Sequence, residues 1–349
     1  MKPSLQEFLF NLLKAQSPSG SEETVVSLLS DYISPFVSEI RKDALGNCIA
    51  LKKGKGNTKI MLMAHADEIG FMINHIDNNG FIYFKCIGCI DCSILPTHKV
   101  SILGKEGPVS GIIGKKPIHL QNGESSNNNI QPEDLWIDIG VRSREEAESL
   151  VSIGDVATLL SNPILIQNDL LAAKSIDDRI GIAILAGVAE MLDKTDLDSD
   201  VYYVASTQEE IGARGAQVAT TSILPDVGIA LDVTHATDYP TMSAIKDGNI
   251  TLGGGVVIPT GPNMNKEINK SLIAIASKEG IAFQNQAIAG PTQTDVRMIQ
   301  IVGTGVKTGL LSIPCRYVHT PNEIISIKDV DSTVSLLVEY LKCYCASSV

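Results

Sequence analysis

Histidines and acidic residues gather at five places in this sequence of 349 residues, and most of these places follow a short apolar run. The first is "MLMAHADEIGFMI", in which a histidine and two carboxylates interrupt a predicted buried strand. In an open α/β sheet, ligands bind beyond the carboxyl ends of the strands, so side chains at such positions can converge on one crevice. The five groups are His65 with Asp67, Asp177 with Asp178, Glu209 with Glu210, Asp232, and His319.

This combination of residue types suits a centre of two divalent metal ions. Two ions roughly 3.5–4 Å apart need a bridging carboxylate and one or two further ligands each. Imidazole together with carboxylate oxygen favours zinc or cobalt over magnesium. Two dications and three carboxylates leave one positive charge, which a bridging hydroxide would neutralise. Such a centre lowers the pKa of bound water, and a nearby carboxylate that binds no metal can accept and return a proton.

Spacing within two of the groups indicates how their roles divide. His65 and Asp67 are two residues apart, so on a strand they point to the same side, and Asp67 can orient the imidazole. Glu209 and Glu210 are neighbours and point in different directions. One of these glutamates can therefore bind metal while the other faces a substrate.

Each group also has an explanation that involves no chemistry. Taken alone, Asp177 and Asp178 are more simply explained as carboxylates that complement a helix N-terminus, with Ser175 as its cap. The adjacent glutamates fit a solvated turn, and the two histidines fit ordinary core or loop positions. The occurrence of all five groups in a chain with only six histidines favours the metal site.

The composition limits the partners and the location of the protein. With 44% hydrophobic residues, the chain can bury a large core in two domains. A formal net charge of -12 repels phosphate backbones, which argues against nucleic acid as a partner. The longest apolar stretch is too short to span a bilayer, and the first residues predict an amphipathic helix and no signal peptide. The sequence therefore predicts a soluble, cytoplasmic protein with no membrane partner.

Three of the seven cysteines lie close together in "CIGCIDC", at Cys86, Cys89 and Cys92. This spacing also occurs in zinc and iron–sulfur sites, which take four thiolates. A fourth thiolate would have to come from a distant cysteine, and the candidates are Cys48, Cys315, Cys343 and Cys345. We interpret the three residues as reduced thiols that pack as small hydrophobic side chains, and we expect no disulfides in a cytoplasmic chain of this size.

Two patterns divide the chain. Between about 70 and 165, short strand candidates alternate with Gly- and Asn-rich turns, which is typical of an all-β segment. The rest alternates predicted strands (59–63, 201–205 and 227–231) with predicted helices (175–192, 266–278 and 328–343), which indicates an α/β sheet with helices on both faces. We therefore expect an α/β domain formed by residues 1–69 and 166–349, interrupted by a β-rich insert over 70–165.

Five segments together resemble the tetrahedral aminopeptidase family: "AHADEIGFMI", "KSIDDRIG", "STQEEIGARGA", "ALDVTHATDYP" and "RYVHTPNE". This family of dinuclear zinc or cobalt metallopeptidases includes glutamyl and deblocking aminopeptidases, and some members carry an endoglucanase label. The resemblance extends along nearly the whole chain, because "SPSGSEE", "VSGIIGKKPIHL" and "GPNMN" are similar as well. It implies a zinc-peptidase-like α/β sandwich with an inserted β-rich dimerisation domain.

The resemblance also implies a centre in which two zinc or cobalt ions share one carboxylate, and it implies a role for each site residue. The implied roles are Asp177 as the bridging ligand, His65 and Asp232 as the other ligands of one ion, Glu210 and His319 as those of the second, Glu209 as general base and acid, and Asp67 as the support of His65. The choice of Asp177 over Asp178 as the bridge follows the family motif alone.

These residues predict an aminopeptidase that hydrolyses the N-terminal residue of short peptides through a metal-bridged hydroxide. The resemblance implies a homo-oligomer, in the form of a twelve-subunit tetrahedral shell. Other hydrolases on the same centre, such as a deacylase or a glycosidase, and a metal-stabilised scaffold remain as alternatives. A glycosidase ordinarily uses two carboxylates and no metal, and a scaffold has no use for an unliganded base. Gln293 stands where a small residue is expected, so the preference of the substrate pocket stays open.

Overall fold

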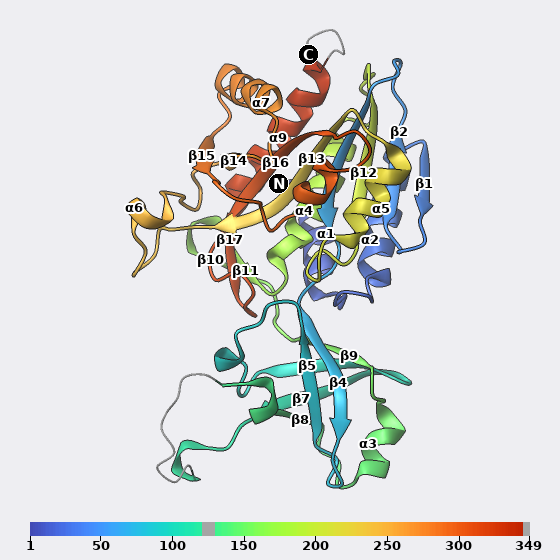
Figure 1. The fold of residues 1–349 in the computed structure, drawn as a ribbon, viewed down its shortest axis with the longest axis vertical. Coiled ribbons are helices and arrows are strands. Elements are labelled where there is room, and N and C mark those ends of the chain that lie inside the picture. The colour runs from blue at the N-terminus through green and yellow to red at the C-terminus, as the bar shows by residue number, and fades with distance from the viewer. Residues whose placement is uncertain (121–129, 345–349) are drawn as a thin grey trace.

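The computed structural model describes residues 1–120 and 130–344, and it consists of two bodies joined end to end (Figure 1). The upper body in the figure is an eight-stranded sheet with helices on both faces. The lower body is a closed barrel of six strands. The protein is therefore an α/β protein with a β-rich insert, as the sequence predicts.

Parallel strands form the centre of the large sheet. In the order in which they lie, its strands are β1 (Glu39–Lys42), β2 (Cys48–Lys52), β12 (Asp200–Ser206), β3 (Lys59–His65), β13 (Val227–His235), β16 (Lys307–Cys315), β14 (Val256–Thr260) and β15 (Phe283–Ala287). Strands β12, β3, β13 and β16 are mutually parallel, whereas β2 and β14 pair antiparallel with their inner neighbours. The predicted strands at 59–63, 201–205 and 227–231 are all present, and each extends beyond the predicted range.

Side-chain alternation along β3 explains why helices cover both faces of the sheet. Ile60, Leu62 and Ala64 belong to the core on one face, and Met61 and Met63 to the core on the other. Helices on the first face are α1 (Pro3–Lys14), α2 (Glu23–Ile33), α4 (Ile176–Met191), α7 (Lys266–Glu279) and α9 (Ile327–Cys343). Those on the second face are α5 (Arg214–Ile223) and α8 (Val296–Gln300).

Helix α4 lies between the sheet and an outer layer of helices. It contacts β3 and β13 on one side and α1, α2 and α9 on the other. Every residue from Ile176 to Ala189 is consequently buried, and from Ile180 to Ala189 the helix is apolar all round, as expected of a helix inside the core. Among the helices of the described ranges, none combines the length and hydropathy that a membrane crossing requires.

The insert forms a barrel with a core of its own. Its strands, in order around the barrel, are β4 (Gly70–Ile76), β5 (Ile82–Ile87), β8 (Trp136–Asp138), β7 (Gly107–Gly114), β6 (Lys99–Gly104) and β9 (Val156–Leu159). Closure removes the exposed edges that an open sheet of this size would present. The interior is filled by apolar side chains such as Phe71, Val100 and Ile137, and helix α3 (Arg144–Leu150) contributes Ala147. A separate small sheet joins β10 (Ile164–Ile166), β11 (Leu170–Ala173) and β17 (Glu323–Ser326).

Strands β3 and β13 separate near their carboxyl ends. Their pairing stops at Met63 and Ala230. Beyond this point β3 stays paired with β12 as far as His65, while β13 stays paired with β16 as far as His235. The two halves of the sheet therefore diverge, and they leave a crevice at the carboxyl edge where side chains from several strands can meet.

We predict that Leu185→Ala in α4 lowers the free energy of unfolding by about 2–5 kcal/mol, because it removes a fully buried side chain and leaves a cavity. Met191→Ala at the exposed end of the same helix is the control, with an expected change below about 0.5 kcal/mol. Denaturant titration followed by circular dichroism measures both. Equal losses in the two variants would contradict the position of α4 inside the core.

Candidate metal centre

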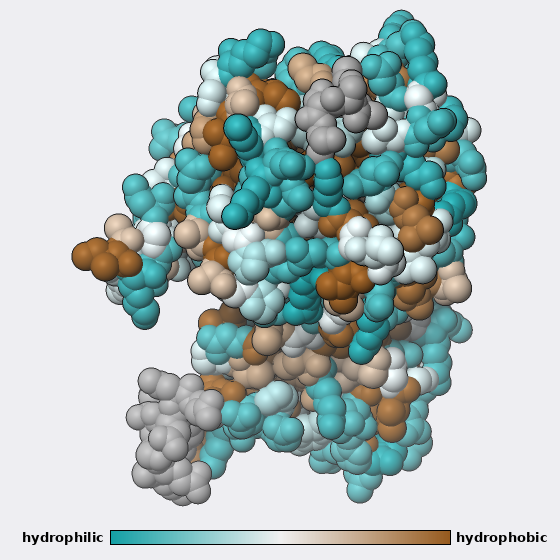
Figure 2. All heavy atoms as spheres, turned by 45° about the horizontal axis from the view of Figure 1, so that its top comes forward, coloured by the Kyte–Doolittle hydropathy of each residue, from teal (hydrophilic) through white to brown (hydrophobic). Residues whose placement is uncertain are grey.

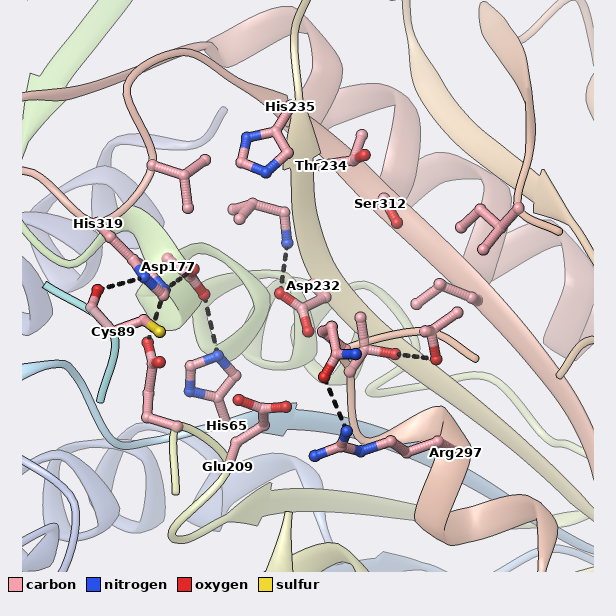
Figure 3. A pocket seen from close by; sticks show the side chains of 18 of the residues that line it. His65, Cys89, Asp177, Glu209, Asp232, Thr234, His235, Arg297, Ser312 and His319 are labelled. Carbon is pink, nitrogen blue, oxygen red and sulfur yellow. Dashed lines mark hydrogen bonds and ion pairs between the residues drawn. The ribbon is translucent and has the colours of Figure 1, made fainter. Parts of the chain in front are cut away.

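A cavity of about 640 Å³ opens at the crevice between β3 and β13 (Figure 3). Side chains from all five groups identified in the sequence line it: His65, Asp177, Glu209, Glu210, Asp232 and His319. Asp67 and Asp178 are not among the lining residues, and both are fully buried. The structure therefore brings together six of the seven residues to which the sequence assigned a role, with Asp67 behind them.

Each lining residue lies at the end of a strand or in the segment that follows one. His65 is the last residue of β3, and Glu209 and Glu210 follow β12. Asp232 lies in the part of β13 that is no longer paired with β3. His319 follows β16, and Asp177 follows β11 at the start of α4. The divergence of the two half-sheets is therefore what allows these side chains to face one another.

The carboxylate of Asp177 faces both histidines. Its Oδ1 lies 3.0 Å from Nε2 of His65, and its Oδ2 lies 3.4 Å from Nε2 of His319. Oε1 of Glu210 lies 3.3 Å from the same Nε2 of His319. Ligand atoms of His65, Asp177 and Glu210 all lie within 4.8 Å of one another, so this set could hold a metal ion. Because each oxygen of Asp177 has its own histidine, this carboxylate has the geometry to serve two ions.

The second ring nitrogen of each histidine is held by a backbone oxygen. Nδ1 of His65 lies 3.2 Å from the carbonyl oxygen of Asp67. Nδ1 of His319 lies 2.8 Å from the carbonyl oxygen of Cys89, which belongs to the loop after β5 in the barrel. A proton donated from Nδ1 leaves the lone pair of Nε2 free for a metal ion. The imidazole of His65 is thus oriented by the segment that follows β3, and the imidazole of His319 by the insert.

Asp67 holds more than the imidazole that the sequence assigned to it. Its Oδ1 lies 3.4 Å from Nδ1 of His65 and accepts a hydrogen bond from the backbone N–H of Glu209 at 3.0 Å. Its Oδ2 accepts from the backbone N–H of Glu210 at 3.1 Å and from the hydroxyl of Ser19 at 2.6 Å. One buried carboxylate therefore fixes the histidine and both glutamates together.

Asp178 points away from the cavity and serves the backbone. Its carboxylate accepts from the N–H of His65 at 3.3 Å and from the N–H of Gly181 at 3.0 Å. The second contact, three residues along the helix, is that of a helix cap. The capping role that the sequence suggested for Ser175 is wrong. The Ser175 hydroxyl makes no capping hydrogen bond and instead donates to Glu68.

A buried ion cluster beneath the cavity has no counterpart in the sequence prediction. Oε2 of Glu68 lies 2.6 Å from Nζ of Lys174, and its Oε1 lies 3.1 Å from Nη2 of Arg179. Arg179 also donates to the carbonyl oxygens of Ala66 and Leu12. The signal was present in "KSIDDR", where two basic residues flank the aspartate pair of an apolar helix.

Glu323 was also missed, although it lies in the motif "RYVHTPNE". This buried carboxylate accepts from the backbone N–H of Asp177 at 3.1 Å and from that of His319 at 2.8 Å. It therefore fixes two cavity residues that are far apart in the chain.

The three clustered cysteines have two different surroundings. The Sγ atoms of Cys86 and Cys92 lie 3.9 Å apart in the barrel, whereas Cys89 lines the cavity.

Three carboxylates of the cavity hold their protons strongly, whereas the pKa of Asp177 is lowered, because its hydrogen bonds to His319 and His65 outweigh the effect of burial. Burial raises the pKa of Glu209 to about 10; His65 opposes this shift, and Asp232 adds to it. Burial likewise raises the pKa of Asp232 well above its usual range, and it raises that of Glu210. Crowded, desolvated carboxylates are unfavourable as anions, so this group favours a bound cation.

The histidines are protonated by the same surroundings. Burial acts to lower the pKa of His65, but its hydrogen bonds to Asp177 and Asp67 raise the pKa well above the usual value. Burial also opposes protonation of His319, whose pKa is nevertheless raised to about 11 by Asp177 and Glu210. In the metal-free protein, protons on the imidazoles therefore supply the positive charge that the ionised carboxylates of Asp177 and Asp67 require. A donor set of imidazole nitrogen and carboxylate oxygen fits zinc or cobalt.

Comparison with known proteins gives a consistent result. Residues 46–336 match the M42 glutamyl aminopeptidase family. The lysyl aminopeptidase of Pyrococcus furiosus is 35% identical over 342 residues, which cover 96% of this chain and 97% of that protein. The glutamyl aminopeptidase of Lactococcus lactis is 27% identical and covers 92% of each chain.

Solved structures of similar proteins superpose on the whole chain. A TET aminopeptidase from a marine sediment archaeon of the Thaumarchaeota matches with a TM-score of 0.94 and 30% identity, covering 99% of this chain and 97% of that one. The TET1 peptidase of Pyrococcus horikoshii matches with a TM-score of 0.88 and 29% identity, covering 97% and 100%. The TET1 peptidase can assemble into a tetrahedron or a large octahedral shell.

We predict that zinc binding to the metal-free protein releases protons at neutral pH. The pKa values of His65 and His319 are raised, so both imidazoles are charged there and must lose a proton to bind metal. The affinity for zinc should consequently increase as the pH rises from roughly 6 to 8. Calorimetric titration in two buffers with different enthalpies of ionisation counts the released protons.

Two variants test the source of these protons. His319→Ala should release fewer protons than the wild type, whereas His75→Ala, at an exposed position on β4, should release the same number. Identical apparent binding enthalpies in both buffers would mean that no net proton release accompanies binding and would contradict the assignment.

Proposed function

Because the chain belongs to the M42 glutamyl aminopeptidase family, we propose that it hydrolyses the N-terminal residue of short peptides with two divalent metal ions, zinc or cobalt. The observation that supports this most directly is the carboxylate of Asp177, whose two oxygens face different histidines. A bridge of this kind is what a pair of closely spaced ions requires.

The donor atoms around the cavity suggest how two ions would be held. The proposed ligands are Asp177 as the shared carboxylate, His65 and Asp232 for one ion, and Glu210 and His319 for the other. When bound, the ions would polarise the scissile carbonyl and lower the pKa of water. Asp67 would act as a positioning residue, since it contacts His65 and the backbone of both glutamates without lining the cavity.

Glu209 is the residue that we propose as general base and acid. It lines the cavity, and within the described ranges its carboxylate takes part in no ion pair. Burial raises its pKa to about 10 in the metal-free protein, where it is therefore protonated at neutral pH. Two bound dications would lower this pKa, and the ionised carboxylate could then accept a proton from the attacking water and deliver it to the leaving amine.

We further propose that the protein is a homo-oligomer and that contacts near the insert contribute to its assembly. All three residues of β10 (Ile164, Leu165 and Ile166) are aliphatic and exposed. Figure 2 shows apolar side chains at the surface where the two bodies meet. Exposed apolar groups of this kind mark protein interfaces. Assembly as in the tetrahedron of the TET1 peptidase would restrict substrates to short peptides by size.

The first test is the initial rate on a panel of aminoacyl 4-nitroanilides, each with a free or acetylated amine, with and without zinc or cobalt. We expect cleavage of the free-amine forms alone, its loss with a chelator, and its recovery with added metal. Cleavage of the acetylated forms would indicate a deacylase. Tight metal binding without any turnover would indicate a scaffold and would contradict the proposal.

We predict that Glu209→Gln lowers kcat by roughly 10²- to 10⁴-fold, because the variant cannot accept a proton, while its metal content is unchanged. The matched control is Glu7→Gln, at an exposed position on α1, which should keep full activity. Steady-state kinetics and elemental analysis measure the two quantities. Near-normal turnover by Glu209→Gln would remove this residue from the mechanism.

A further inference from the structure

A single arginine lines the cavity, and within the described ranges it forms no ion pair with an acidic side chain. Arg297 is the second residue of α8, is half-buried, and extends from the helix toward Asp232 and Glu209 in Figure 3. Its Nη1 donates a hydrogen bond to Oε1 of Gln293 at 2.8 Å. In the described part of the chain, the arginines that form ion pairs are Arg179 and Arg316.

The nearest acidic residue in the sequence is occupied elsewhere. Asp295 is fully buried, and its Oδ2 accepts a hydrogen bond from the hydroxyl of Ser206 at 2.5 Å. The carboxylates that line the cavity all belong to the candidate metal centre, where bound cations would balance their charge. The charge of Arg297 acts on Asp295, but within the described ranges no ion pair joins Arg297 to Asp295 or to any other carboxylate.

Apart from the residues of the candidate metal centre, the neighbours of Arg297 in the cavity wall named below are uncharged. Near Arg297 in the chain the cavity is lined by Pro291, Thr292 and Thr294, and from other elements by Ile288, Leu310 and Ser312. A guanidinium carries five N–H donors in a fixed fork that fits a carboxylate through two parallel hydrogen bonds. Gln293 engages one end of the fork and leaves the remaining donors available.

We propose that Arg297 binds a carboxylate of the substrate, so that the enzyme prefers peptides with a negative charge in reach of the metal centre. The inference rests on the proposed aminopeptidase function. The carboxylate has two sources: the side chain of an N-terminal glutamate or aspartate, or the C-terminus of a short peptide. Gln293, which departs from the expected small residue in the sequence, acts as the positioning residue for the guanidinium.

A purely structural role for the pair is the competing explanation. Gln293 and Arg297 are four residues apart and could do no more than fix the loop to α8. In that case their substitution would change stability or all rates alike. A carboxylate site predicts in addition that the ratio of rates on charged and uncharged substrates of equal shape changes.

Two matched pairs of substrates test the proposal in the metal-loaded enzyme. Glutamyl and glutaminyl 4-nitroanilide differ by a side-chain charge, and trialanine and its C-terminal amide differ by a terminal charge. We expect kcat/KM to favour the charged member of one pair by roughly 10- to 100-fold. Arg297→Gln should bring that ratio near one, and Arg297→Lys should retain part of it, since a lysine keeps the charge but loses the fork.

Controls separate selectivity from folding. Arg41→Gln, on the edge strand β1, should keep both ratios. Gln293→Ala leaves the arginine in place and should lower the same ratio to a smaller extent. The pair whose ratio falls identifies the source of the carboxylate. If Arg297→Gln is folded and active and neither ratio changes, the proposal is overturned.

A binding measurement distinguishes this proposal from the proposed function. Calorimetry compares L-glutamate with L-glutamine, and trialanine with its amide, on wild type and on Arg297→Gln. If the wild type cleaves no peptide but binds the charged member more tightly, and Arg297→Gln loses that preference, the carboxylate site stands and the aminopeptidase function fails. Equal affinities for both members in both proteins would refute the carboxylate site.

Discussion

The position of the candidate metal centre depends on the ion cluster beneath it. Glu68, Lys174 and Arg179 are all buried, and an unpaired charge at such a depth costs several kcal/mol. Glu68 therefore holds both cations in place. Glu68 belongs to the chain that leaves β3, and the two cations belong to the chain that enters α4. Through these contacts the end of β3 and the start of α4, which carry two of the cavity residues, are fixed against each other.

Above this cluster, the divergence of the sheet leaves room for the cavity, and the crowded carboxylates in it favour a bound cation. Strands β3 and β13 part at Met63 and Ala230, so that side chains that would otherwise lie in the core face a shared cavity. The resulting density of acid is unfavourable without cations, which is why burial raises the pKa of Asp232 and of Glu209. The same arrangement that is costly in the metal-free protein would therefore favour the divalent ions that we propose.

The central strands and most of the cavity residues could be predicted, because they depend on residue type and on the local sequence pattern. Short apolar runs between predicted helices indicated the central strands, and acids or histidines at their ends indicated the cavity. The supporting contacts could not be predicted, because they join residues that are distant in sequence: Glu323 accepts from the backbone of Asp177. The capping role also fell to a different residue. Ser175 has the preferred residue type, but its hydroxyl is used by Glu68, and Asp178 caps the helix instead. The preference of a residue type for a cap position does not show that a distant residue will take its hydroxyl as a hydrogen-bond donor.

The contact between His319 and the insert has a consequence for how this family of proteins can vary. The imidazole is held by the main-chain carbonyl of residue 89, and every amino acid supplies that group. This contact therefore sets no requirement on the side chain at position 89, although that side chain lines the cavity. What cannot drift is the path of the loop that carries it, because its length and its turns decide where the oxygen lies. A contact of this kind constrains the backbone of the loop and leaves the choice of side chain to the other demands of the cavity.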